Sequence, residues 1–285
     1  IIGEAIYRHP KALYEEYQAV DINVKSSALL RLWNLSSDTL PIEHLTQEAK
    51  REIVEREPLV LSHIKEVYPE LFEKRAILEQ KSYVDSQIIA DEYAEIYDLP
   101  TSQDRLFQFI NRSNLTPTER ISLIKFMLSN FSDIHETNVA HRDLGQDCIW
   151  ASPTKISFSG FMSATLPNKK TIRQRLPILK SNRITLPEHE LDDLETDPFK
   201  QDVFLLGVAA HLIAFGESLE LEGGVPDWKK RDGFEEYHQW FEKALSWEPS
   251  DRFANAKEML DAINEISIDE DESIDISDQI SIYRI

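Results

Sequence analysis

Short apolar runs separated by turn residues characterise the first part of the chain. Residues 1–33 are rich in β-branched and aromatic side chains, with turn-like breaks at 9–10 (His-Pro) and 21–27. This pattern predicts short strands, although residues 11–17 also suit a helix. Residues 27–33 (Ser-Ala-Leu-Leu-Arg-Leu-Trp) predict a buried strand that contains one cation, Arg31.

The apolar spacing changes to a helical period after Thr46. Residues 46–64 combine a capping residue, Thr46, with apolar side chains at helical intervals, which predicts a helix. Pro58 interrupts this segment and predicts a kink, after which a second helical segment would begin. Alternation returns over 83–97 and predicts two further strands, followed by a stiff connector at 98–100 (Asp-Leu-Pro).

From Gln103 onwards the pattern is mainly helical. Helical spacing predicts helices over residues 103–110, 116–136, 198–215, 233–247 and 254–263. Because strands come first and helices follow, we expect an α+β protein with a β-rich lobe at 1–98 and a larger helical lobe at 99–266. Residues 267–285 repeat Ser, Ile, Asp and Glu without a helical period, which indicates an acidic linker or tail, or else a strand docked on a sheet edge.

The charge of the chain argues against two classes of partner. The formal net charge is -20, from 51 acidic and 31 basic residues, so we expect repulsion from nucleic-acid phosphates and anionic lipids. The longest apolar run, 203–215, contains Gly207 and His211 and is shorter than the roughly 20 residues that span a bilayer. We interpret it as a core helix, and we expect neither a membrane span nor direct nucleic-acid binding.

A single cysteine, Cys148, limits the covalent chemistry of the chain. It excludes an internal disulfide and a multi-cysteine zinc site, and it fits a cytoplasmic location. The sequence begins with Ile1 and shows no signal-peptide pattern, so we expect a piece of a longer protein.

Residues 134–144 (Ile-His-Glu-Thr-Asn-Val-Ala-His-Arg-Asp-Leu) resemble the approach to the catalytic loop of protein kinases. Further segments resemble kinase motifs in kinase order, namely 28–33, 56–61, 186–188 (Leu-Pro-Glu), 202–208 (Asp-Val-Phe-Leu-Leu-Gly-Val) and 247–252 (Trp-Glu-Pro-Ser-Asp-Arg). The resemblance covers nearly the whole chain and implies a bilobal protein-kinase-like fold.

The resemblance also implies roles for individual residues. Asp143 stands at the position of the catalytic base, within the motif formed with His141 and Arg142. Arg31 stands where a lysine normally contacts ATP phosphates, and Glu57 where a helix glutamate pairs with that lysine. Because arginine prefers bidentate carboxylate partners, we expect a structural Arg31–Glu57 ion pair, with Glu55 as the partner if the register shifts by two residues. Direct contact with a nucleotide phosphate is the alternative role of Arg31.

The resemblance implies a purely structural role for three other residues. Asp202 would accept the backbone N–H groups of the catalytic loop, and Glu188 would form a buried ion pair with Arg252. Loss of one partner from such a pair typically costs about 3–5 kcal/mol.

The positions expected to handle magnesium and phosphate are changed. Alignment of 155–157 with the strand before the kinase Asp-Phe-Gly motif puts Phe158 at the metal-binding Asp, and Cys148 falls at the metal-binding Asn. Magnesium requires hard oxygen ligands, so we expect no metal site, with Asp147 as an alternative donor only if the loop register shifts. Gly145 replaces the usual lysine.

The phosphate loop is changed as well. A loop that cradles phosphates needs several glycines, but the N-terminal segment offers only Gly3. ATP and magnesium would be needed only if the protein is active.

A narrower resemblance rests on four phrases, at residues 14–19, 28–33, 140–145 and 157–161. These look like bacterial kinase-like domains that sit beside nuclease-related (NERD) or helicase modules, as in the kinases of phage-growth-limitation and BREX-type defence systems. This resemblance implies an anti-phage setting, in which the partners are neighbouring domains of the same polypeptide or another defence protein.

Two hypotheses follow. The first is a pseudokinase, a kinase-shaped regulatory or binding module of a larger bacterial protein. The alternative is a divergent Ser/Thr protein kinase that uses Asp143 to transfer phosphate from ATP. A nucleotidyltransferase on the same fold ranks last, because it would also need metal carboxylates.

Overall fold

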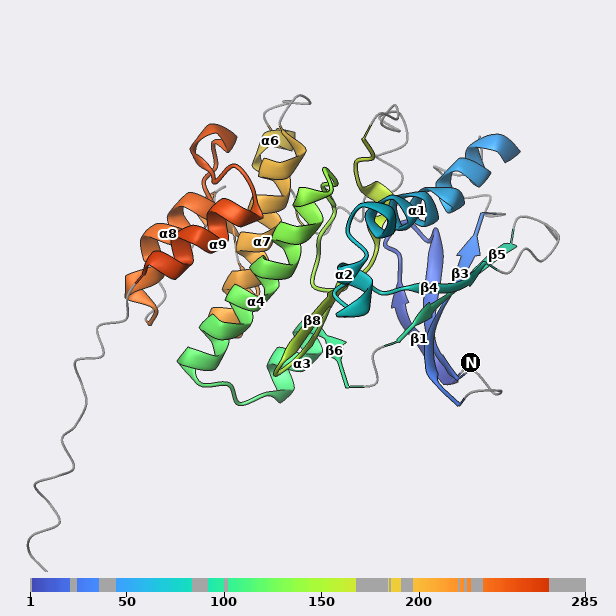
Figure 1. Ribbon diagram of the computed structural model, residues 1–285, viewed down its shortest axis with the longest axis horizontal. Coiled ribbons are helices and arrows are strands. Elements are labelled where there is room, and N and C mark those ends of the chain that lie inside the picture. The colour runs from blue at the N-terminus through green and yellow to red at the C-terminus, as the bar shows by residue number, and fades with distance from the viewer. Residues whose placement is uncertain are drawn as a thin grey trace, which may run out of the picture.

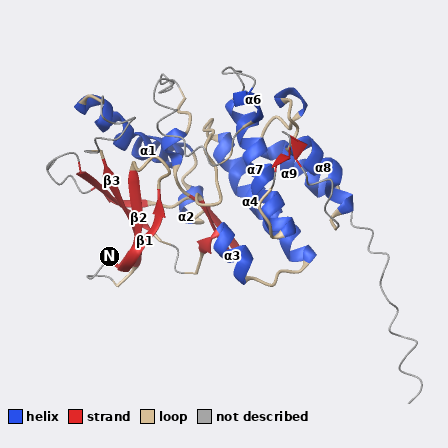
Figure 2. Ribbon diagram, turned by 180° about the vertical axis from the view of Figure 1, so that it is seen from behind, coloured by secondary structure: helices blue, strands red, loops and turns tan. Residues whose placement is uncertain are grey.

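The computed structural model describes residues 2–20, 25–35, 45–83, 92–99, 102–167, 184, 186–190, 197–219, 221–222, 225–226 and 233–266. A β-rich part that carries the N-terminus lies at one end, and a helical part lies at the other (Figures 1 and 2). The acidic segment 267–285 and residues 84–91 of the predicted strand region lie outside the described residues.

A five-stranded antiparallel sheet forms the β-rich part, in the order β1-β2-β3-β5-β4. The strands are β1 (Ile2–Arg8), β2 (Tyr14–Val20), β3 (Ser27–Asn34), β4 (Gln80–Tyr83) and β5 (Glu92–Asp98). The buried strand predicted around Arg31 is confirmed as β3. The helical alternative for residues 11–17 is wrong, because β2 begins at Tyr14 and pairs with β3 along its whole length.

Helix α1 (Gln47–Val67) covers one side of this sheet and begins at its cap, Thr46, whose hydroxyl accepts from the Ala49 N–H. The helix runs through Pro58 without interruption, so the predicted second segment is wrong. The two halves of α1 bury apolar side chains in different core clusters, Ile53 in the smaller and Val60 in the larger. This packing on both sides of the proline offsets its missing hydrogen bond.

The helical part is built around two long helices, α4 (Pro117–Glu136) and α7 (Pro198–Phe215). Thr116 and Glu119 form a reciprocal capping box at the start of α4. The other elements here are α2 (Glu70–Glu73), α3 (Leu106–Arg112), α6 (Pro187–Glu190), α8 (His238–Ala244), α9 (Ala256–Glu265) and the 3₁₀ turns η1 (Phe161–Ser163), η3 (Glu235–Tyr237) and η4 (Pro249–Asp251). The helix predicted over 233–247 is therefore shorter and begins with a 3₁₀ turn.

Helix α7 packs against α4, α8 and α9, as expected for a core helix. Among the described residues it is the one helix with the length and hydropathy to cross a membrane, and 72% of that segment is buried inside the protein.

Two small sets of short strands complete the fold. Strands β6 (Asp104–Arg105), β7 (Ile149–Ser152) and β8 (Lys155–Phe158) form a small antiparallel sheet, and β9 (Leu221–Glu222) pairs with β10 (Val225–Pro226) in a two-stranded ribbon. The helix predicted from residue 103 starts three residues later, at Leu106, because Asp104 and Arg105 pair with β7.

The two parts share one hydrophobic core. The backbone of Phe158 exchanges hydrogen bonds with residues 76 and 78 of the segment after α2, at 2.8 and 2.9 Å. The larger core cluster contains Leu29 of β3 as well as the buried faces of α4 and α7. These backbone hydrogen bonds and shared core residues join the two parts.

Candidate functional site

Asp202 of α7 anchors the loop between α4 and β7. Its two carboxylate oxygens accept the backbone N–H groups of His141 and Arg142, both at 2.6 Å. His135 places Nε2 3.1 Å from the same carboxylate. The structure thus brings Asp202 to the loop N–H groups that the resemblance implied.

His141 connects this loop to the turn after β8. Its ring is fully buried, with Nε2 3.0 Å from the carbonyl oxygen of Ser159 and Nδ1 accepting the Asp143 N–H at 3.4 Å. The ring packs against Phe161. Arg142 adopts a left-handed backbone conformation, with φ of 69°. Asp143 follows and is half-buried.

The turn after β8 places Ser159, not Phe158, beside this loop. The Phe158 ring is fully buried against Phe131, with ring centroids 5.0 Å apart. The Ser159 N–H instead donates to the Cys148 carbonyl at 2.9 Å, and its hydroxyl accepts from Trp150 at 3.1 Å. The alignment that placed Phe158 at the metal-binding position is therefore shifted by one residue. Strand alternation turns the Phe158 side chain into the core.

The side chains around Cys148 are a poor set of metal ligands. The Ser159 hydroxyl is engaged by Trp150, and Cys148 itself directs its thiol at the Asp143 carbonyl at 3.7 Å. Burial, with the charge of Asp143 second, raises the pKa of Cys148 to about 12, so the thiol is neutral at pH 7. Asp147 lies half-buried in the same loop. No group of three or more His, Cys, Asp or Glu side chains that could hold a metal occurs among the described residues.

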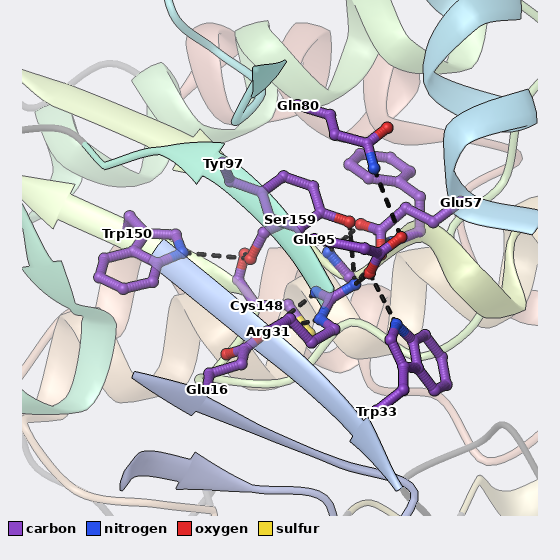
Figure 3. A network of polar contacts seen from close by, with 12 residues as sticks. Glu16, Arg31, Trp33, Glu57, Gln80, Glu95, Tyr97, Cys148, Trp150 and Ser159 are labelled. Atoms are coloured by element: carbon purple, nitrogen blue, oxygen red, sulfur yellow. Dashed lines mark hydrogen bonds and ion pairs between the residues drawn. The ribbon is translucent and has the colours of Figure 1, made fainter. Parts of the chain in front are cut away.

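Arg31 is the centre of a buried ionic cluster (Figure 3). Its side chain is 1% exposed. Nε and Nη2 contact Glu16 at 3.0 and 2.9 Å, and Nη1 contacts both Glu57 and Glu95, the latter at 3.3 Å. Nη1 also donates to the Tyr97 hydroxyl at 3.0 Å. The ion pair expected with Glu57 is present, and the alternative partner Glu55 is only half-buried on α1.

Strand register explains why this cluster forms. Glu16 of β2, Arg31 of β3 and Glu95 of β5 are direct cross-strand partners, so their side chains lie on one face of the sheet. The rings of Tyr14 and Tyr97, two residues along their strands, lie 4.7 and 4.9 Å from the guanidinium carbon. Aromatic faces on both sides add cation–π attraction to the ion pairs.

Glu57 extends the cluster to the turn after β8. Its Oε1 accepts the backbone N–H groups of Gly160 and Phe161, both at 2.9 Å, while Oε2 faces Arg31. Gly160 has φ of 83°, and a Cβ here would lie 2.9 Å from the Cys148 sulfur. Glu57 therefore joins α1, β3 and this turn through one carboxylate.

Arg105 closes the cluster from the helical side, and the sequence interpretation did not identify it. Its Nη2 pairs with Glu16, and its guanidinium lies 4.2 Å above the Trp150 ring and 5.4 Å from the Tyr7 ring. The side chain is 6% exposed. Arg105 and Trp150 are cross-strand partners of β6 and β7, whereas Glu16 lies on β2, so the Arg105–Glu16 pair joins the small sheet to the five-stranded sheet.

The pKa values of two carboxyls reflect their partners. Burial acts to raise the pKa of Glu16, but the adjacent Arg105 and Arg31 outweigh it and hold that pKa below the ordinary value. Burial raises the pKa of Glu95 to about 7, with Arg31 opposing the shift and Glu57 adding to it. Glu95 thus differs from Glu16 in having less positive charge beside it.

Gly3 does not lie in the turn where a phosphate-binding loop would be. It is an exposed residue near the start of β1, with φ of 71°. The β1–β2 turn is closed by the Ala12 N–H, which donates to the His9 carbonyl at 2.8 Å, and it buries Leu13 fully. Residues 9–13 of this turn contain no glycine, and the assignment of Gly3 to a nucleotide site remains a prediction.

Glu188 and Arg252 form a separate buried ion pair away from this cluster. Arg252 Nη2 and Nη1 contact the two Glu188 oxygens at 2.8 and 3.2 Å, and both side chains are shielded from solvent. The guanidinium also lies 4.8 Å from the Phe204 ring of α7. This bidentate pair fixes the short helix α6 to the body of the helical part.

Comparison with known proteins adds evidence at the level of the fold. No family model and no curated protein sequence matches the chain. Its structure is similar to the crystal structure of the PknI kinase domain of Mycobacterium tuberculosis, with a TM-score of 0.56 and 15% sequence identity. The similarity covers 92% of this chain and 93% of that domain. The chain therefore has the bilobal α+β fold of a protein kinase.

Proposed function

We propose that this protein is a pseudokinase, a kinase-shaped binding or regulatory module that does not transfer phosphate. The observation that carries the proposal is the state of Arg31, the cation at the phosphate-contacting position. Three carboxylates and a tyrosine hydroxyl engage its guanidinium, and the side chain is 1% exposed. A nucleotide phosphate would have to replace these partners and approach Glu16 and Glu57 against like-charge repulsion.

The space in front of Arg31 is also occupied. Arg105 is stacked on Trp150 and paired with Glu16, so a ligand entering between the lobes toward Arg31 would have to break a buried ion pair. Truncation of one partner of such a pair typically costs about 3–5 kcal/mol. That penalty corresponds to a loss of more than a hundredfold in affinity.

The side chains at the positions expected to bind magnesium also support the pseudokinase proposal. Phosphoryl transfer depends on magnesium held by carboxylate and amide oxygens. Ser159 and Cys148 would stand in place of such ligands; the Cys148 thiol contacts the Asp143 carbonyl, and the Ser159 hydroxyl accepts from Trp150. The intact loop anchors, in contrast, support a scaffold that keeps its shape.

A calorimetric titration with ATP and magnesium tests the proposal. We expect no heat of binding at micromolar nucleotide for the wild-type chain, and the Asp143→Asn variant serves as the matched control. Magnesium-dependent binding in the micromolar range, weakened by Asp143→Asn, would overturn the pseudokinase proposal.

One observation favours the second candidate, a divergent Ser/Thr kinase. Asp202 holds the backbone N–H groups of His141 and Arg142 with hydrogen bonds of 2.6 Å, and the His141 ring ties this loop to the Ser159 carbonyl at 3.0 Å, so the base position is fixed. An active kinase would transfer radiolabelled phosphate from ATP to itself or to a neighbouring domain, and Asp143→Ala would abolish the transfer. We expect no transfer from the wild-type protein.

We also propose that the module belongs to a larger bacterial anti-phage protein, a setting supported by the four phrases that resemble defence-associated kinase-like domains. Plaque assays with the full-length protein test this. We expect Arg31→Met to reduce phage protection and Asp143→Asn to leave it unchanged. The absence of phage protection by the wild-type protein would refute the defence role, while leaving the pseudokinase proposal intact.

A further inference from the structure

Five buried ionisable residues meet between the lobes and do not balance in charge. We call Glu16, Arg31, Glu57, Glu95 and Arg105 the interlobe cluster; each is at most 6% exposed. Two guanidiniums face three carboxyls, so full ionisation would leave one uncompensated negative charge in a region closed to water. Such a charge is strongly unfavourable, and the group that carries it takes up a proton instead.

The contacts identify which carboxyl this is. Glu16 pairs with both Arg31 and Arg105, and Glu57 pairs with Arg31 and accepts two backbone N–H groups. Glu95 has one cationic contact, the 3.3 Å contact to Arg31. Its closer donor is neutral, the Trp33 Nε1–H at 2.8 Å.

Every element packed around Glu95 contributes a group that sets its charge. Helix α1 presents Glu57, β2 presents Glu16 behind the guanidinium, and β4 presents the neutral Gln80, whose amide lies 3.5 Å away. Strand β3 presents Arg31 and Trp33. Strand β5 itself adds Tyr97, whose pKa burial raises well above its ordinary value, so that its phenol is neutral. The surroundings of Glu95 thus contain one full positive charge and two competing carboxylates.

We propose that Glu95 holds a proton whose release changes how Arg31 is shared, so that this carboxyl is a pH-sensitive switch between the sheet and the turn after β8. Glu57 and Glu95 both contact the same nitrogen of Arg31, Nη1. When Glu95 is ionised, it draws Arg31 toward itself and weakens the Arg31–Glu57 pair. Glu57 in turn holds Gly160 and Phe161, so α1 and this turn lose part of their attachment to β3.

The direction of the pH effect follows from linkage. The pKa of Glu95 is about 7 in the folded protein, against an ordinary value of 4.5. An opening that exposes Glu95 to water releases its proton between these two values, so opening becomes about tenfold more favourable per pH unit in that range. Above pH 7 both forms are ionised, and the effect levels off.

Amide hydrogen exchange on the full chain tests the switch. In the wild type we expect the protection of the Gly160 and Phe161 amides to fall about tenfold per pH unit from 4.5 to 7, and then to become constant. Glu95→Gln imitates the protonated acid and keeps an acceptor for Trp33, so its protection should not change with pH. Glu4→Gln makes the same chemical change at an exposed site of β1 and should behave as the wild type.

The indole N–H resonance of Trp33 provides a second measurement on the wild-type chain alone, which does not require the variant to fold. It should titrate near pH 7, because Trp33 donates directly to Glu95. A resonance that does not titrate near pH 7 would overturn the inference. So would protection that is independent of pH in the wild type, or a pH dependence that persists in Glu95→Gln.

Discussion

Replacement of Arg31 by methionine is the most direct test of the energetics of the interlobe cluster. Methionine keeps much of the side-chain length but removes the charge that Glu16, Glu57 and Glu95 share. Glu16 retains Arg105, and Glu95 can remain protonated, so the main loss falls on Glu57. One unpaired buried charge typically costs about 3–5 kcal/mol, a large share of the roughly 5–15 kcal/mol by which domains are stable.

The assay is urea unfolding followed by circular dichroism and tryptophan fluorescence. Two companions make the result specific. Arg8→Met breaks an exposed ion pair with Glu15 and should cost less than about 1 kcal/mol. The double variant Arg31→Met with Glu57→Leu removes both charges, so it should regain part of the stability that the single variant loses.

The outcome that refutes this reasoning is a loss for Arg31→Met no larger than that for Arg8→Met. It would mean that water reaches the cluster and screens Glu57, so the carboxylates would not need Arg31. The proposal that Arg31 is closed to a nucleotide phosphate would then fail as well. A double variant less stable than Arg31→Met would instead show that Glu57 is held mainly by Gly160 and Phe161.

Three further outcomes are expected. The free energy of unfolding should fall by up to about 3 kcal/mol as pH rises from 4.5 to 7, because folded Glu95 holds its proton up to a pKa of about 7; pH-dependent urea unfolding measures this fall, and Glu95→Gln should reduce it. Gly207→Ala should destabilise by about 1–3 kcal/mol in thermal unfolding, since its Cβ would lie 2.9 Å from Leu245; an unchanged midpoint would show that Leu245 can move. Cys148 should react with iodoacetamide far more slowly in the folded protein than in urea at pH 8, because its thiol has a pKa of about 12; equal rates, measured by mass spectrometry, would contradict the raised pKa.

The pseudokinase and active-kinase proposals require the same scaffold and differ only in the role they give to a few side chains. The anchors Asp202 and the Glu188–Arg252 pair hold backbone, and their contacts are the same whether or not phosphate is transferred. The difference lies in charge around Asp143 and Arg31. Assays that separate binding from transfer are therefore more informative here than stability measurements alone.

Local sequence pattern was sufficient for the elements whose packing follows from their own periodicity. The apolar run around Arg31 predicted β3, and the capping residue Thr46 marked the start of α1. Pattern failed at Pro58, because the packing that keeps α1 continuous comes from two core clusters distant in sequence. It also failed at residues 104–105, where pairing with β7 overrides a helical period.

The order of the motifs in the sequence determined the kinase-like fold, together with the Arg31–Glu57 pair and the role of Asp202 as an anchor. Only the tertiary structure decided what surrounds Arg31. Glu16 and Glu95 are polar residues in strand patterns, and they become partners of Arg31 solely through the register of three strands. Arg105 has no sequence signal, because its contacts with Glu16 and Tyr7 join β6 to strands that are distant in the sequence, and its contact with Trp150 depends on the pairing of β6 with β7. Electrostatic state depends on all neighbours within a few ångströms, and those neighbours are set by the fold.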